Sequence, residues 1–179
     1  VSDLIQDEEH NAKNTNQLFK LIHASNPPRW EHPRCTGRRP QPRRIPGFTQ
    51  INGTGYLFGG LGKGYLNDLH TINLETLTWT KVKGGGLVPS ARYCCAMAPL
   101  NDRWIIMCGG YSGYDGSLFD DCWYLDTGSN GWKQLPVRMS VGTMNHTLTR
   151  TDDVRGVVLF GGYSDEGGQL STLQSFTFK

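Results

Sequence analysis

The chain has 179 residues and a formal net charge of +2 at pH 7, so its overall charge gives little attraction toward nucleic acids or membranes. Its sequence contains no run of about 20 apolar residues, and its first residues lack the charged-then-apolar pattern of a signal peptide, so we expect neither a membrane span nor secretion. The five cysteines form no C-x-x-C pair, which argues against a zinc site and favours buried free thiols in a reducing, cytoplasmic compartment.

The first 41 residues differ from the rest and are predicted to form an irregular or partly helical N-terminal extension. Ser2 can cap a helix whose first turn carries acidic residues. The stretch NQLFKLI (16–22) can instead be a strand, because Phe19-Lys20-Leu21 resembles the outer strands described below and would then close a blade. The residue pattern leaves helix and strand open.

Residues 27–47 form a segment rich in arginine and proline. Repeated prolines exclude a helix here. One hypothesis is an arm that contacts RNA or an acidic partner, with Trp30 available for base stacking. The alternative is a solvated linker in which Arg44 has a structural role. The candidate arm residues are Arg29, Trp30, Arg34, Arg38, Arg39 and Arg43.

From residue 42 onward, the same landmarks return about every 50 residues. An apolar run ends in Gly-Gly at Gly59, Gly109 and Gly161, and an outer tryptophan recurs at Trp79 and Trp132. Steps resembling LNDL (66–69) follow at 119–122 and 170–173, and Arg44, Arg92 and His146 precede the three Gly-Gly pairs. Recurrence of independent landmarks at one period indicates a repeat protein. The predicted units are 42–86, 87–136 and 137–179, the last one truncated.

Each unit is predicted to contain four short strands. In the middle unit these are 92–100, 103–110, 120–126 and 131–136. The second of them is apolar throughout, so both of its faces should be buried and its sheet should lie between similar sheets. A β-propeller is the architecture that packs four-stranded sheets in this way. The glycine pairs allow positive φ beside a neighbouring sheet, and the tryptophans offer a large face that covers it.

These motifs resemble the kelch repeat, whose period is about 50 residues. The resemblance covers residues 42–179, with Ile72 and Leu125 standing seven residues before each tryptophan where the family often has Tyr. It implies an all-β fold, an incomplete kelch-type β-propeller of about three four-stranded blades. It also implies a protein-interaction module, an adaptor or scaffold. The stretch NDLHTINLETLTW (67–79) is similar to units of kelch-domain substrate receptors of ubiquitin ligases, a less favoured alternative.

Three units are fewer than the four to eight blades of typical propellers. Two blade faces would be left in water, and such apolar areas are larger than monomers usually expose. We therefore expect the chain, which lacks an initiator Met, to be part of a longer protein. The alternatives are pairing of two copies into a six-blade ring, or another subunit that covers the open faces.

The sequence shows no catalytic constellation. GGLGKG (59–64) lacks the Gly-Lys-Ser/Thr ending of a phosphate-binding loop, and His146 is expected to be a satisfied residue of an inner strand rather than a metal ligand. We expect no cofactor, no metal site and no enzyme activity within this segment, although a kelch-fold enzyme whose ligands lie elsewhere stays open.

What remains is a binding surface made by the loops that follow the Gly-Gly pairs. These loops are rich in Tyr, Ser, Gly and Asp, a composition typical of adaptable protein recognition. The predicted function is binding of a protein partner at one face of the propeller. The alternative is a structural subunit of a ribonucleoprotein or filament that is held by the arginine-rich arm. The candidate contact residues are Lys63, Tyr65, Arg92, Tyr93, Tyr111, Tyr114, Asp115, Tyr163 and Asp165.

Overall fold

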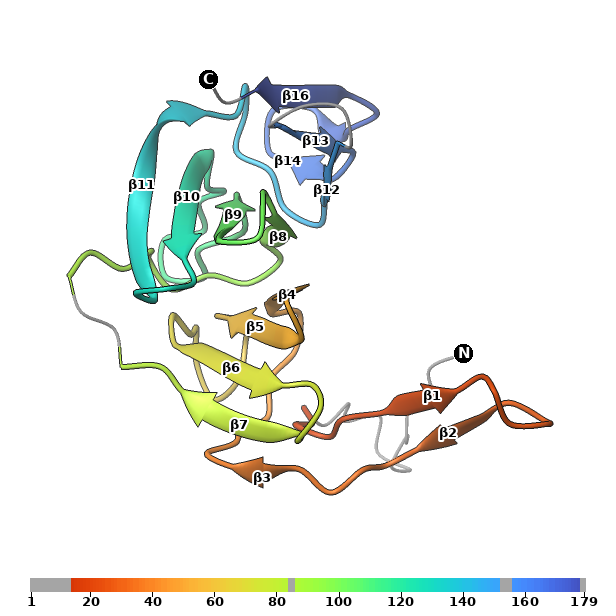
Figure 1. Cartoon of the computed structure of the whole chain (residues 1–179). Coiled ribbons are helices and arrows are strands. Elements are labelled where there is room, and N and C mark those ends of the chain that lie inside the picture. Colours follow the sequence, from red (N-terminus) through yellow and green to blue (C-terminus); the bar gives the residue numbers. More distant parts are fainter. Residues whose placement is uncertain (1–13, 84–85, 152–155, 178–179) are drawn as a thin grey trace, which may run out of the picture.

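The computed structural model of the chain describes residues 14–83, 86–151 and 156–177 (Figure 1). All regular structure in these residues is β-strand, which confirms the all-β prediction, whereas the helix predicted from Ser2 falls largely outside them. The strands are β1 (Lys20–Ile22), β2 (Arg29–Glu31), β3 (Thr36–Gly37), β4 (Gly47–Ile51), β5 (Thr54–Phe58), β6 (Leu69–Asn73), β7 (Thr78–Lys81), β8 (Ala96–Pro99), β9 (Trp104–Cys108), β10 (Asp121–Asp126), β11 (Gly131–Arg138), β12 (Thr147–Arg150), β13 (Gly156–Phe160), β14 (Tyr163–Ser164), β15 (Gly168–Gln169) and β16 (Leu173–Thr177).

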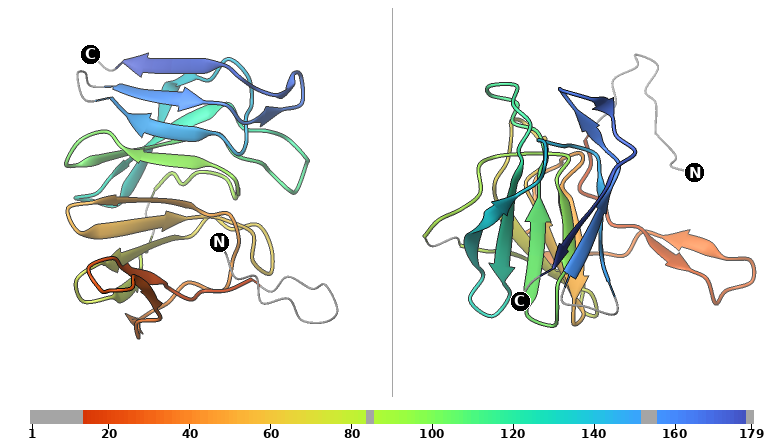
Figure 2. Two further views of the ribbon diagram at one scale, coloured as in Figure 1. Left: turned by 90° about the vertical axis from the view of Figure 1, so that its right-hand side faces the viewer. Right: turned by 90° about the horizontal axis from the view of Figure 1, so that it is seen from above.

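Three antiparallel sheets follow one another around an open side, as in part of a β-propeller (Figures 1 and 2). Blade 1 contains β4 to β7, blade 2 contains β8 to β11, and blade 3 contains β12, β13 and β16. The inner strands β4, β8 and β12 lie on the concave side, and β8 packs between the other two. The incomplete propeller predicted from the repeat is therefore confirmed.

The strands of blade 2 follow the prediction closely, and β9 is buried on both faces as expected. Its inner strand is the exception, because β8 begins at Ala96 rather than at residue 92. The four preceding residues are irregular, with an isolated bridge between Tyr93 and Tyr111 and a φ of 59° at Cys94. Apolar side chains from blades 1 and 2 form one core cluster, and those from blades 2 and 3 form a second. All five cysteines are buried and unpaired.

The Gly-Gly pairs join one blade to the next. Gly59 and Gly60 have φ values of 64° and 98°, as the sequence analysis anticipated. The Gly60 amide donates a hydrogen bond of 2.9 Å to the Arg92 carbonyl of the next unit, and Gly110 donates one of 2.9 Å to the Thr143 carbonyl. A Cβ on Gly59 would lie 2.5 Å from that Arg92 oxygen. Glycine is needed here because the next blade's backbone approaches too closely for any side chain.

A cross-strand pair beside each Gly-Gly faces the following blade. In blade 1 the pair is Phe58 and Leu69, which are 0% and 5% exposed beneath blade 2. Cys108 and Cys122 occupy the same positions in blade 2 and are fully buried beneath blade 3. In blade 3 the pair is Phe160 and Leu173, which are 53% and 66% exposed. The exposure arises because no further blade covers this face in the described structure.

The N-terminal segment forms a hairpin of β1 and β2 that projects from blade 1 (Figures 1 and 2). Strand was thus the correct alternative for residues 20–22, but β1 pairs with β2 alone and closes none of the three blades. The hairpin has the register of a blade's outer strands. Leu21 lies opposite Trp30 just as Ile72 lies opposite Trp79 in blade 1 and Leu125 opposite Trp132 in blade 2.

The same segment covers part of the outer face of blade 1. β3 pairs in parallel with β7, where Thr36 lies opposite Thr78. Cys35 packs with Ile72 and Trp79 in a third core cluster, and Leu18 packs against it. One of the two predicted open faces is therefore partly closed by the chain itself. The boundary at residue 41 between an extension and a propeller segment stays a prediction.

Candidate interaction surface

In blades 1 and 2 a buried ion pair holds the segment before the inner strand against the end of the loop beyond the Gly-Gly pair. The Arg92 guanidinium, 0% exposed, donates to both carboxylate oxygens of Asp121 at 2.5 and 3.0 Å and to the Gly109 carbonyl at 3.0 Å. Burial opposes ionisation of Asp121, but the hydrogen bonds and charge of Arg92 outweigh it and lower the pKa of this carboxyl. Because Arg92 has no exposed surface, it cannot contact a partner, and its prediction as a contact residue was wrong.

Blade 1 repeats this arrangement with Arg43 and Asp68. Arg43 is 7% exposed, and its guanidinium donates to the two Asp68 oxygens at 2.6 and 3.0 Å and to the Gly59 carbonyl at 2.9 Å. The structural arginine is therefore Arg43 and not Arg44, and Arg43 is not available to a nucleic-acid arm. The prediction was one residue off because two adjacent arginines offered equally good spacing.

Blade 3 lacks both members of the pair. Thr143 has the place of Arg92, since its carbonyl accepts the bond from Gly110 as the Arg92 carbonyl does from Gly60. Thr172 has the place of Asp121, since its carbonyl accepts from the Gly161 amide. Replacing only one partner would leave a buried charge unpaired, which is costly. It is therefore expected on physical grounds that both partners are absent together. His146, the predicted counterpart of the arginines, lies three residues further along the chain.

Four predicted tyrosines from two neighbouring units form one cluster at this end of the blades. The ring of Tyr65, in the loop after β5, stacks on Tyr93 with centroids 5.9 Å apart. Tyr65 also meets Tyr114 edge to face at 5.0 Å, and Tyr93 meets Tyr111 edge to face at 5.4 Å. Tyr114 is 75% exposed. We call Tyr65, Tyr93, Tyr111 and Tyr114 the tyrosine cluster.

Hydrogen bonds within the loop that carries Tyr111 and Tyr114 hold it in one conformation. Asp115 accepts hydrogen bonds from the amide and hydroxyl of Ser117 at 3.1 and 2.8 Å. Bonds from Ser112 and Ser117 lower the pKa of Asp115 to about 2, so this exposed carboxylate is ionised at neutral pH. A Cβ on Gly113 would lie 1.6 Å from the Tyr65 ring, so the two loops touch here and any side chain at this position would displace the ring.

Of the other predicted contact residues, Tyr163 and Asp165 lie in the third unit, whereas Lys63 shares a loop with Tyr65. Tyr163 is 41% exposed in the small β14–β15 hairpin, where it pairs with Met144, and Asp165 is exposed in the turn of that hairpin. Lys63 is exposed in the loop before Tyr65. The structure thus brings together four of the nine predicted residues.

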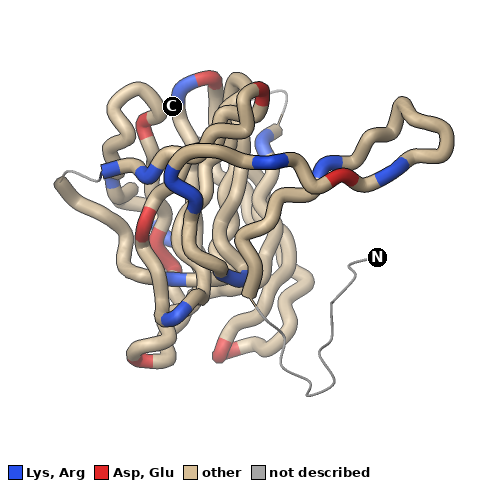
Figure 3. The backbone as a smooth tube through the Cα atoms, turned by 90° about the horizontal axis from the view of Figure 1, so that it is seen from below, with Lys and Arg blue, Asp and Glu red and all other residues tan. Residues whose placement is uncertain are grey.

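The predicted arm is only partly free. Figure 3 shows Lys and Arg along the N-terminal segment that projects from blade 1. Arg29 forms an exposed ion pair with Glu31 at 2.9 Å, and Arg39 donates to the Cys35 carbonyl. Trp30 is 63% exposed, and Arg34 and Arg38 are also exposed. Sequence reasoning did not find His70 and Lys81, which line a pocket together with Arg38 and Arg39.

The described residues contain no group of three or more side chains suited to hold a metal ion, and no helix among them is long and apolar enough to cross a membrane. His146 is buried with both ring nitrogens unpaired. Burial lowers the pKa of His146 to about 4, so the ring is neutral at physiological pH.

Comparison with known proteins gives a consistent result. Residues 6–162 match the KLHDC2/KLHL20/DRC7 Kelch-repeats domain family. The chain is 31% identical over 147 residues to human Kelch domain-containing protein 1, which covers 80% of this chain and 36% of that protein. It is 28% identical over 135 residues to bovine Kelch domain-containing protein 2, covering 74% of this chain and 33% of that protein. It is 32% identical over 107 residues to Acyl-CoA-binding domain-containing protein 4 of Arabidopsis thaliana, which covers 59% of this chain and 16% of that protein. The chain spans about a third of the length of the first two relatives.

Proposed function

We propose that this chain, which belongs to the kelch-repeat family, is a protein-binding module that contacts its partner through the tyrosine cluster. The observation that supports the proposal is a set of ring contacts between neighbouring units. Tyr65 and Tyr93 stack on each other, and they contact Tyr114 and Tyr111, respectively, in the loop after the second Gly-Gly pair. An adaptor or scaffold role within a larger assembly follows from the same surface.

The physical argument rests on how these side chains are presented. A tyrosine ring offers a large contact area with little loss of conformational freedom on binding, and its hydroxyl keeps a hydrogen bond available. Ring-to-ring contacts and the Ser117–Asp115 bonds hold this surface in place before a partner arrives. Preorganisation of this kind lowers the entropy cost of association. The ionised Asp115 beside Tyr114 favours a partner with a basic or hydrogen-bond-donating group.

The ribonucleoprotein alternative has less support. Of its six candidate residues, Arg43 is buried in an ion pair and Arg29 is bonded to Glu31. RNA binding stays a prediction from the sequence. Its test is the salt dependence of RNA affinity, with Arg34 and Arg38 changed to Gln.

The proposal is tested by comparing the proteins that co-purify with the wild-type chain and with the variant Tyr114→Ala. Tyr114 is mostly exposed, so its removal should leave the fold intact. Loss of a central aromatic anchor typically costs about 2 kcal/mol or more of binding, so we expect at least a tenfold loss of affinity for the captured partner.

The matched control is Val137→Ala, at a 42% exposed residue on β11, which should bind the same partner as wild type. Equal binding by Tyr114→Ala and Tyr65→Ala variants, both verified as folded, would rule out the tyrosine cluster as the contact surface. Capture that depended instead on Tyr163 would move the surface to the β14–β15 hairpin.

A further inference from the structure

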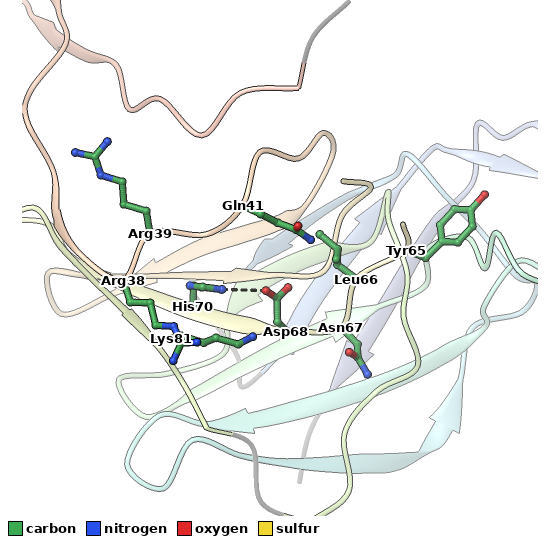
Figure 4. A pocket seen from close by; sticks show the side chains of 9 residues that line it. All are labelled: Arg38, Arg39, Gln41, Tyr65, Leu66, Asn67, Asp68, His70 and Lys81. Carbon is green, nitrogen blue, oxygen red and sulfur yellow. Dashed lines mark hydrogen bonds and ion pairs between the residues drawn. The ribbon is translucent and has the colours of Figure 1, made fainter. Parts of the chain in front are cut away.

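A pocket of about 400 Å³ lies at blade 1, lined by residues of β6 and β7, of the segment after β3, and of the loop that carries Tyr65 (Figure 4). Leu69 packs in the core shared with blade 2, and His70, the next residue of β6, therefore lies on the opposite face. Lys81 of β7 pairs with His70, and the segment after β3 brings Arg38 and Arg39 to the same place. The volume lies in the range of binding pockets for small molecules.

The pocket carries more positive than negative charge. Its one carboxylate, Asp68, already accepts hydrogen bonds from Arg43 and from His70. Figure 4 shows the Arg38 and Lys81 side chains on the same side of the pocket as His70, with Lys81 extending toward Asp68. Neither of them forms an ion pair within the part of the chain that the structure describes. Neighbouring like charges repel each other unless an anion lies between or beside them.

His70, which lines the pocket, has a buried ring nitrogen without a hydrogen-bond partner. Its side chain is 3% exposed, and its Nε2 lies 2.9 Å from Asp68 Oδ2. Its Nδ1 is buried and has no partner. Buried polar atoms without a partner are uncommon, and each one calls for a physical explanation. A ligand in the pocket that His70 lines would supply the missing partner.

Comparison with blade 2 shows that these groups are not required by the repeat. Trp123 stands two residues after Asp121, as His70 stands two after Asp68, and its Nε1 donates to Asp121 at 2.7 Å. A tryptophan makes that bond without a second ring nitrogen. Gln134 pairs with Trp123 where Lys81 pairs with His70. Blade 1 therefore keeps the structural bond and adds both an uncommitted nitrogen and a cation.

We propose that this pocket binds a phosphate monoester group. Arg38 and Lys81 would neutralise it, and His70 Nδ1 would share a hydrogen bond with one of its oxygens, whereas the Arg39 guanidinium is already bonded to the Cys35 carbonyl. A phosphate monoester carries roughly −1.5 to −2 charges at neutral pH and several acceptor oxygens, which matches a group of cations better than one carboxylate does. Guanidinium groups also fit phosphate geometry with paired N–H donors. The phosphate belongs either to a phosphorylated side chain or to a free small molecule. The inference does not rest on the proposed function.

The test is a titration of the protein with inorganic phosphate and with N-acetyl-O-phosphoserine amide, followed by amide NMR shifts. We expect saturable binding with shifts around His70 and Lys81. The variants Lys81→Gln, which copies blade 2, and Arg38→Gln should each weaken binding roughly tenfold, because each removes a charge-assisted contact. Lys133→Gln removes an exposed cation from β11 and should leave affinity within about twofold of wild type.

The two probes distinguish the sources of the phosphate. Tighter binding of the phosphoserine derivative supports a phosphorylated side chain, whereas equal binding supports a free phosphorylated molecule. Shifts that do not saturate, or an equal loss of affinity in Lys133→Gln and Lys81→Gln, would overturn the proposal. So would unchanged affinity in both pocket variants.

Discussion

Arg92 and Asp121 form a buried ion pair, in which each charge offsets the energetic cost of burying the other. The carboxylate is bonded by the guanidinium and by the Trp123 indole, and Arg92 also reaches the Gly109 backbone. The guanidinium carbon lies 3.8 Å from the Phe119 ring centroid, so an aromatic face covers the charge. Removing one partner strands a charge in the interior, whereas removing both does not.

We therefore expect Arg92→Thr to lower the free energy of unfolding by about 3–5 kcal/mol. The double variant Arg92→Thr with Asp121→Thr copies the residues of blade 3 and should cost clearly less than the sum of the two single changes. Urea unfolding of all three variants measures this coupling. Additive effects would mean that the pair is energetically independent. Arg138→Gln, at an exposed ion pair, should cost less than about 1 kcal/mol.

His146 gives the protein a pH dependence of defined sign. Its pKa in the folded protein is about 4, below the ordinary value of 6.5, because burial disfavours the charged ring. The unfolded chain thus binds the proton first as the pH falls, so stability is lost between about pH 6.5 and 4 and this loss stops below that range. The shift corresponds to about 3 kcal/mol. His146→Leu should show a stability curve flatter by this amount. Parallel curves for the two proteins would contradict the assignment.

At the scale of single elements, the two Tyr-bearing loops depend on one glycine. A Cβ at Gly113 would overlap the Tyr65 ring at 1.6 Å, and that ring packs against the rings of Tyr93 and Tyr114. We expect Gly113→Ala to displace Tyr65 from Tyr93 and Tyr114, changing the near-ultraviolet circular dichroism and reducing partner binding. The change in unfolding free energy should be small, because the ring moves at the surface. Gly64→Ala, where nothing lies within 4 Å of an added Cβ, is the control.

The elements that the sequence predicted are those whose cause is local. Gly59 and Gly109 are glycines because the backbone there has positive φ, and β9 is an unbroken apolar run because both of its faces are buried. Both features are visible in the repeated sequence, so the positions of these elements could be predicted. β3 was not predicted, because two residues pair in parallel with β7 only through contacts distant in sequence. The β1–β2 hairpin did leave a signal, since Trp30 precedes Trp79 by 49 residues, close to the period.

The candidate site also contains residues that the sequence predicted and residues that become neighbours only in the folded structure. The composition of the loops identified Tyr65, Tyr111 and Tyr114, and the place at the start of the inner strand identified Tyr93, but neither showed which of the predicted tyrosines meet. Arg92 was misassigned to the surface, because an arginine beside a loop gives no sequence signal of its buried partner 29 residues further on. His70 and Lys81 were missed because they become neighbours only through the pairing of β6 with β7.

For the whole molecule, the position of a blade in the series decides how firmly it is held. Blade 2 is packed on both faces, whereas blade 3 shares only one core cluster. In repeat proteins the stability is roughly a sum of unit and nearest-neighbour terms. We expect amide hydrogens of β9 and β10 to exchange more slowly than those of β13 by about tenfold or more. Uniform exchange across the blades would mean that the segment unfolds as one cooperative unit.

The hydrogen bond from the second glycine to the next blade uses the same backbone atoms at both interfaces, so it cannot distinguish one blade from another. The two interfaces differ instead in the pair beside this bond, which is bulky in Phe58 and Leu69 and small in Cys108 and Cys122. Phe160 and Leu173 restore the bulky form, so a surface shaped to cover Phe58 and Leu69 is the shape that fits them. Blade 2 covers the first pair with Trp132, whose ring lies 4.9 Å from Phe58, and any surface that docks on blade 3 needs a comparable aromatic face.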